Sequence, residues 1–202
     1  MHRRNSEETM QRLLDAGAEL FDKKGYHNVS IKEIGRLAGC NSALISYHYG
    51  SKQALYQAII DSQLNALQQL QERLEKEALP PLQRLKEYLH TILKSQLDPN
   101  RHMIILYQEL LTPSGLLSSD SWDRLSRMGD YVQYLLAQAV AQGELKTPAD
   151  KDDFNYMTFI LSAVTELLFL IKDRPLPTNP EGRPANELLD SLIDYVLRPL
   201  LP

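Results

Sequence analysis

The chain has 202 residues, 43% hydrophobic and 24% charged, so it is long enough to bury a core and has the composition of a soluble globular protein. Its single cysteine, Cys40, excludes an intramolecular disulfide and a cysteine-based zinc site within one chain. The net charge of −4 argues against a general nucleic-acid binder. Residues 1–52 nevertheless carry eight Lys or Arg and six Asp or Glu, a net +2, whereas residues 53–202 carry fourteen and twenty, a net −6. A slightly basic N-terminal part is therefore joined to an acidic body.

Neither the N-terminal residues nor the most apolar segment of the sequence is expected to enter a membrane. The N-terminal residues MHRRNSEETM lack the apolar run of a signal peptide. The most apolar segment, residues 154–171, contains Asn155 and several Ser, Thr and Glu residues, and is a little too short to span a bilayer. We therefore expect a buried helix there, no membrane association, and a cytoplasmic protein.

Three short helical segments are expected before residue 52. The first has an apolar face from Met10 to Phe21 and ends at Gly25. Ser30, with Glu33 three residues later, forms a capping box that begins a helix over 31–38. Either Asn41 or Ser42 caps a third helix, which runs to about His48 and ends at Gly50.

Helical periodicity continues to the C-terminus, and strand patterns are absent. Ser51 caps a helix of twenty-five residues that starts at Lys52. Further helices are expected over 82–97, 101–111, 121–142, 151–172 and 187–200. The predicted fold class is all-α, with about nine helices: a three-helix helix-turn-helix unit over residues 1–52 and a helical bundle over residues 53–202.

The second and third helices have the tight spacing of a helix-turn-helix. Ala38 is small where the helices cross, and Gly39 permits the turn. Leu44, Ile45 and Tyr49 can anchor the third helix on the core, which leaves a polar face outward. That face comprises Ser42, Ala43, Ser46 and Tyr47, with His48 at its end. The pattern alone fits two structures equally well, a helix that enters the major groove of DNA and a plain helical hairpin with a solvated face.

Residues 9–55 resemble the DNA-binding domain of the TetR family of bacterial transcriptional regulators. The resemblance rests on five motifs: Gly25-Tyr26, Ser30, Ala38-Gly39-Cys40, Tyr47-His48-Tyr49 and Gly50-Ser51-Lys52. It implies a homodimeric regulator, expected to be a repressor, that places two recognition helices on a pseudo-palindromic operator in double-stranded DNA.

The resemblance also implies roles for individual residues in DNA binding. Ser30 faces a phosphate, Lys32 reaches a base or a phosphate, and Lys52 binds a phosphate. Asn41, Ser42, Ala43 and Ser46 belong to the part of the motif that meets the bases, and Tyr47 and His48 clamp the backbone. Many family members carry an aromatic residue at the position of Ser46. Because Ser and Ala read bases weakly, specificity is expected to rest more on DNA shape, water and symmetry.

Residues 78–115 resemble the CerR-type C-terminal domain of one subgroup of the family, which implies binding of a small-molecule effector and dimerisation through the last two helices. The candidate effector contacts are Met103, Tyr107, Leu110, Trp122, Thr158, Ser162 and Glu166. A stripe of Met and aromatic side chains at helical spacing is more often core than pocket, and Glu166 is more often paired by a hydrogen bond or salt bridge across the dimer than bound to a cationic ligand. A ligand-independent architectural DNA-binding protein is the alternative function. Motifs of catalysis or phosphate binding are absent, so no enzyme activity, cofactor or metal site is expected.

Overall fold

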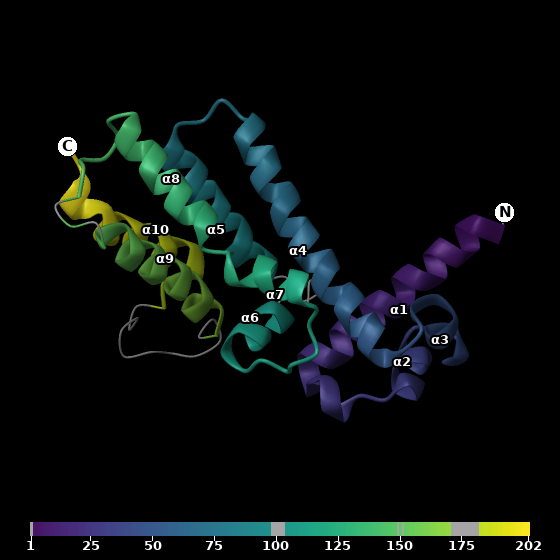
Figure 1. Cartoon of the computed structure of the whole chain (residues 1–202). Helices are drawn as coiled ribbons and strands as arrows, with labels where there is room; N and C mark the ends of the chain where they lie inside the picture. Colours follow the sequence, from purple (N-terminus) through teal and green to yellow (C-terminus); the bar gives the residue numbers. More distant parts are fainter. Residues whose placement is uncertain (1, 98–103, 149, 151, 171–181) are drawn as a thin grey trace. The chain divides into compact units, whose positions relative to one another are not determined.

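The computed structural model describes residues 2–97, 104–148, 150, 152–170 and 182–202, and this part of the chain is helical throughout, without strands. The expected all-α class is therefore confirmed. The helices in Figure 1 are α1 (His2–Lys24), α2 (Ile31–Leu37), α3 (Ala43–Tyr49), α4 (Lys52–Lys76), α5 (Pro81–Leu97), α6 (Ile104–Leu111), α7 (Ser119–Ser126), α8 (Asp130–Ala141), α9 (Asp153–Leu170) and α10 (Ala185–Leu197), with 3-10 turns η1 (Tyr26–Asn28) and η2 (Arg198–Leu200).

The chain divides into two compact units, one with residues 1–67 and 100–125 and the other with residues 68–99 and 126–202. The first unit contains α1 to α3, the beginning of α4, and α6 with α7. The second contains the end of α4 and helices α5, α8, α9 and α10. The functional division between residues 52 and 53 stays a prediction.

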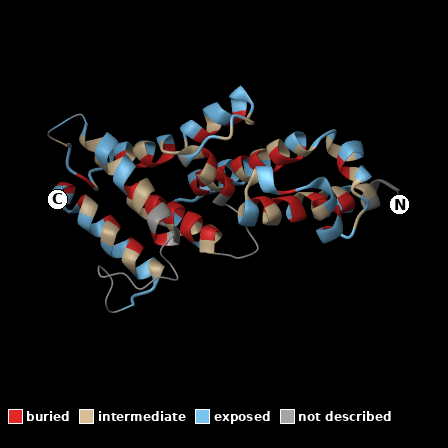
Figure 2. Ribbon diagram, turned by 90° about the horizontal axis from the view of Figure 1, so that it is seen from below, coloured by how far each residue is buried: buried red, intermediate tan, exposed pale blue. Residues whose placement is uncertain are grey.

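The core of the N-terminal unit is formed by the inward faces of its helices, whose buried residues are red in Figure 2. Leu13, Phe21, Ile34, Ile45 and Leu55 are almost completely buried in it. Helix α1 ends where expected, because Lys23 and Lys24 lie in its last turn and Gly25 adopts the left-handed conformation, with φ of 72°. The apolar periodicity of the sequence therefore predicts this core correctly.

The C-terminal unit is a bundle in which α5 packs against α8, α9 and α10. Polar contacts hold α5 in register at its edges: Lys86 pairs with Asp194 at 2.8 Å, and His90 with Asp190 at 2.8 Å, both on α10. Leucine and isoleucine side chains fill the interior. No helix among the described residues is long and apolar enough to cross a membrane.

The structure differs from the expected helices at two places, between residues 121 and 142 and at residues 198–200, which form η2 instead of continuing the helix expected over 187–200. The segment 121–142 is not a single helix, because a turn at residues 127–129 separates α7 from α8. Gly129 lies at this turn, and a Cβ there would stand 3.3 Å from Thr158 Cγ2 on α9. Glycine has a low helix propensity, which fits the break between α7 and α8, and it has no side chain, which permits the close approach of α9. Near the C-terminus, α10 gives way to η2, which contains Pro199.

Candidate functional site

The two helices of the helix-turn-helix meet with almost no space between their backbones. A Cβ on Gly35 would lie 3.0 Å from Cys40 O and 3.0 Å from both the Cα and the N of Ser42. Gly39 makes the turn, with φ of 63°, and Ala38 is buried, both as expected. Sequence reasoning missed Gly35, although a glycine inside a helical pattern is itself a signal of close packing.

Helix α3 is fixed to the core by one face. Ile45 is completely buried, Leu44 is half-buried, and the Tyr49 hydroxyl donates a 2.8 Å hydrogen bond to the carbonyl of Met10 on α1. These are the three anchors expected from the sequence. Their contacts leave the opposite face of α3 free of the core.

The outward face of α3 carries the residues expected to meet a partner. Ala43, Ser46 and Tyr47 are exposed, Tyr47 by 79%, and Ser42 and His48 are half-buried. The rings of Tyr47 and His48 meet edge to face, with centroids 4.8 Å apart. The helix therefore presents small side chains for most of its length and an aromatic pair at its end.

Hydrogen bonds at the start of α3 show which of the two expected residues, Asn41 or Ser42, caps this helix. Asn41 Oδ1 accepts a 2.9 Å hydrogen bond from the backbone N–H of Ala43, while the Ser42 side chain makes no capping bond. Asn41 is therefore the capping side chain. The exposed Asn41 keeps its amide NH₂ for other contacts.

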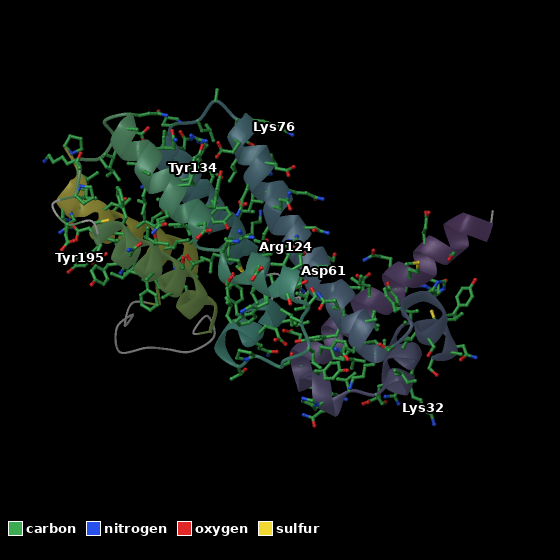
Figure 3. All side chains as sticks on the ribbon, viewed as in Figure 1. Lys32, Asp61, Lys76, Arg124, Tyr134 and Tyr195 are labelled. Atoms are coloured by element: carbon green, nitrogen blue, oxygen red, sulfur yellow. The ribbon has the colours of Figure 1, made fainter. Side chains whose placement is uncertain are left out.

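Helix α2 begins with the expected capping box. Glu33 N donates to Ser30 Oγ at 3.2 Å, and Ser30 N donates to Glu33 Oε2 at 2.9 Å. Hydrogen bonds from Lys24 and then from Ser30 lower the pKa of Glu33 from 4.5 to about 2. Lys32, in the same turn, is exposed and projects away from the ribbon in Figure 3.

Lys52 lies at the first turn of α4 with its ammonium over aromatic rings. Its Nζ is 4.1 Å from the ring centroid of Tyr26 and 5.9 Å from that of Phe21. Ser51 caps the same turn by accepting a 3.0 Å hydrogen bond from Ala54 N. Burial lowers the pKa of Lys52, and the negative charge of Glu33 opposes that shift.

The expected effector contacts fall into both units of the chain. Tyr107 is buried, Leu110 is half-buried and Trp122 is exposed in the N-terminal unit. In the C-terminal unit, Thr158 and Ser162 are half-buried on α9. Met103 and the side chain of Glu166 lie outside the described part of the structure. Effector roles for these residues stay predictions.

One buried polar side chain of the C-terminal unit was missed. Gln96 on α5 is only 5% exposed, and neither atom of its amide has a hydrogen-bond partner. The hydroxyl of Thr158 on α9 is also buried without a partner. An unpaired buried amide is unfavourable, so Gln96 is a candidate for contact with a bound molecule or an ordered water. Gln96 follows Leu89, Ile92 and Leu93 at helical spacing, so a polar residue on this apolar face of α5 could have signalled the position.

Polar contacts also join α4 to the segment around α6 and α7 within the N-terminal unit. Glu109 is 2% exposed, and its carboxylate accepts hydrogen bonds from the Tyr56 hydroxyl at 2.5 Å and from Ser114 N at 3.0 Å. Ser121 Oγ, on α7, donates a 2.6 Å hydrogen bond to Asp61 on α4. Asp61 and Arg124, which also lies on α7, are labelled in Figure 3. The Tyr56–Glu109 and Asp61–Ser121 contacts cannot be predicted from helical periodicity, because each joins residues more than fifty positions apart.

Helices α9 and α10 carry large apolar side chains on the surface of the C-terminal unit. Phe159 is 73% exposed and Tyr195 67% exposed, and Tyr156 and Ile160 are exposed beside Phe159 in the sequence. Tyr195 projects outward in Figure 3. Exposed groups of this size on neighbouring helices of one bundle are typical of an association surface.

Comparisons with known proteins agree with this geometry. Residues 13–59 match the model of the bacterial regulatory proteins of the tetR family. The chain is 29% identical over 152 residues to the HTH-type transcriptional regulator SrpR of Pseudomonas putida, covering 72% of this chain and 67% of the relative. It is 28% identical over 149 residues to the HTH-type transcriptional regulator RutR of Escherichia coli (strain K12), covering 72% and 68%. Both relatives are regulators rather than enzymes.

The fold is shared with solved structures across nearly the whole chain. The structure of AibR in complex with isovaleryl coenzyme A and operator DNA has a TM-score of 0.69, with 18% identity, and the match covers 94% of this chain and 98% of that one. At this identity the likeness concerns the fold alone.

Proposed function

Since this chain belongs to the TetR family of bacterial transcriptional regulators, we propose that it represses transcription as a homodimer and leaves its operator when a small molecule binds. Its DNA-binding part comprises residues 1–52, and residues 53–202 bind the effector and form the dimer. The observation that carries the proposal is the geometry of α3, which is anchored by Ile45 and Tyr49 and presents an exposed, lightly decorated face.

DNA contacts are assigned to that face and to the helix starts beside it. Ser42, Ala43 and Ser46 meet base edges in the major groove, because small side chains let the helix backbone approach closely. Tyr47 and His48 contact the sugar-phosphate backbone, and Asn41 donates from its free NH₂. Lys32, Lys52 and the capped turn at Ser30 contact phosphates.

The dimer is assigned to α9 and α10. A C2 dimer would cover Phe159, Tyr156 and Tyr195, whose exposure on a monomer favours nonspecific association. Two recognition helices that enter successive major grooves must stand about 34–36 Å apart, and the dimer supplies the second copy of α3.

Effector binding is assigned to the C-terminal unit. The relative AibR was solved with isovaleryl coenzyme A and operator DNA, which sets a precedent for a small-molecule effector on this fold. In the C-terminal unit of this chain, the unpaired amide of Gln96 and hydroxyl of Thr158 favour a polar ligand, with Ser162 as a further candidate. Effector roles for Tyr107, Leu110 and Trp122, which belong to the N-terminal unit, stay predictions from the sequence. A ligand-independent architectural protein has no need of unpaired buried polar groups, so these groups also favour the effector hypothesis over that alternative.

A binding-site selection with the full chain tests the proposal. We expect enrichment of an inverted repeat whose half-sites are about one helical turn apart, and a shift in half-site preference for Ser42→Ala. Lys52→Ala is the matched control, because loss of a phosphate contact weakens binding to all sequences about equally. Enrichment of no sequence, or of an asymmetric single site, would contradict the proposal.

A further inference from the structure

The ammonium of Lys52 is held by an aromatic surface rather than by a carboxylate. Its Nζ stands 4.1 Å from the ring centroid of Tyr26, well within the range of a cation–π contact, and 5.9 Å from that of Phe21. Tyr26 lies in η1, just after α1, whereas Lys52 opens α4. The contact therefore joins two elements that are twenty-six positions apart in the sequence.

The ring of Tyr26 is itself firmly supported. Its centroid lies 5.6 Å from that of Phe21 and 5.1 Å from that of Tyr56, and Phe21 and Tyr56 meet edge to face at 5.2 Å. Phe21 and Tyr56 are both buried, and the Tyr56 hydroxyl is hydrogen-bonded to Glu109. A ring braced on two buried rings presents a fixed face to Lys52.

The Glu33 carboxylate, whose charge acts on Lys52, is already bound by other donors. Glu33 Oε1 accepts from Lys24 Nζ at 2.8 Å, and Glu33 Oε2 accepts from Ser30 N at 2.9 Å and from Ser30 Oγ at 2.8 Å. Within the described residues, Lys52 forms neither a salt bridge nor a hydrogen bond. The Tyr26 ring covers only one side of the ammonium, so the N–H donors that point away from the ring stay available to a phosphate.

The backbone that carries Lys52 is also fixed. Gly50 adopts φ of 84° in the turn before α4, and Ser51 caps the first turn of this twenty-five-residue helix. A lysine with a fixed Cα and a fixed ammonium loses less side-chain freedom when it binds a phosphate than a freely moving surface lysine does.

We propose that Tyr26 is a positioning residue for DNA binding: its ring holds the Lys52 ammonium in place with the N–H donors free, so that this lysine is preorganised for a DNA phosphate. The inference rests on the proposed function, in which Lys52 binds a phosphate. Tyr26 acts through Lys52, and the aromatic face, not the hydroxyl, is what this role requires.

A double-mutant cycle tests the role. The probe is the duplex recovered by binding-site selection with the wild-type chain, and affinity is measured by fluorescence anisotropy at several salt concentrations. The variants are Tyr26→Phe, Tyr26→Met, Lys52→Met and the double variant Tyr26→Met/Lys52→Met, each checked for folding by its thermal melting curve. Phenylalanine keeps the π face and removes the hydroxyl, and methionine removes the ring at similar volume.

We expect Tyr26→Phe to bind within about twofold of wild type and Tyr26→Met to bind about two- to thirtyfold more weakly, the range of a cation–π contact. In the Lys52→Met background the Tyr26→Met change should cost no further affinity. If Tyr26→Met lowered DNA affinity equally in both backgrounds, Tyr26 would be a general structural residue and the inference would be wrong. The inference would also be wrong if Tyr26→Met bound DNA like wild type while Lys52→Met bound it more weakly.

The proposed contact between Lys52 and a phosphate is tested separately, by the salt dependence of DNA binding. Lys52→Met should lower the slope of log affinity against log salt concentration by about one, and an unchanged slope would remove the premise rather than the ring contact. If the Tyr26→Met variant does not fold, the NMR spectrum of the wild-type protein tests whether Lys52 stacks on the Tyr26 ring. Upfield ring-current shifts of the Lys52 side-chain protons support the stacked geometry, and random-coil shifts overturn it.

Discussion

Replacing Gly35 with alanine should separate the stability of the DNA-binding unit from its ability to bind. The added Cβ would lie 3.0 Å from Cys40 O and from two backbone atoms of Ser42, about 0.5 Å inside ordinary van der Waals contact. Backbone cannot rotate away as a side-chain tip can, so the turn between α2 and α3 must move. Overpacking of this kind costs about 1–3 kcal/mol, and alanine returns about 0.8–1.0 kcal/mol of helix propensity over glycine. The net loss is therefore about 0–2 kcal/mol.

Gly17→Ala is the matched control for this substitution. Its Cβ would also approach another atom to 3.0 Å, but that atom is Ile59 Cδ1, the tip of a side chain, and the gain in helix propensity is the same. In urea denaturation, the free energy of unfolding of Gly35→Ala should be at least about 1 kcal/mol lower than that of Gly17→Ala.

The DNA-binding assay carries the sharper expectation. Because Ser42 begins α3, a displaced turn moves the whole recognition surface, so folded Gly35→Ala should bind the selected operator at least about tenfold more weakly, while Gly17→Ala stays within a few-fold of wild type. Equal midpoints in urea together with equal operator affinities would show that the turn absorbs a methyl group, and the argument from close packing would be wrong.

Three further outcomes follow from single residues. Gln96→Met should raise the free energy of unfolding of the ligand-free protein by about 1–3 kcal/mol, because it removes an unpaired buried amide, and lower stability in urea would mean that the amide has a partner. Folding lowers the pKa of Glu33 from 4.5 to about 2, so its stabilising contribution is present above pH 4.5 and disappears as the pH falls toward 2. Wild type should therefore lose more stability over that interval than Glu33→Gln, and parallel pH curves would contradict the assignment. Phe159→Glu should yield monomers by light scattering at micromolar concentration, whereas Ala137→Glu, at an exposed position on α8, should not, and a persistent Phe159→Glu dimer would place the interface elsewhere.

The sequence by itself determined the all-helical class, most helix ends and the resemblance of residues 9–55 to the TetR family. Local chemistry is sufficient for these features: Ser30 and Glu33 form their capping box within one turn, and Gly25 ends α1 through its own left-handed conformation. The helix-turn-helix and its anchors Ile45 and Tyr49 were predictable for the same reason, since their spacing lies within a short stretch of chain.

Only the tertiary structure decided which residues meet across the chain. The choice of Asn41 over Ser42 as the cap, the close approach at Gly35 and the break between α7 and α8 each depend on side-chain geometry or on a neighbouring helix. The same holds for Lys52 over Tyr26 and for the unpaired amide of Gln96. Helical periodicity states which face of a segment is buried, but it carries no information about the partner of that face. Contacts between distant segments arise from packing, which the pattern of one segment cannot encode.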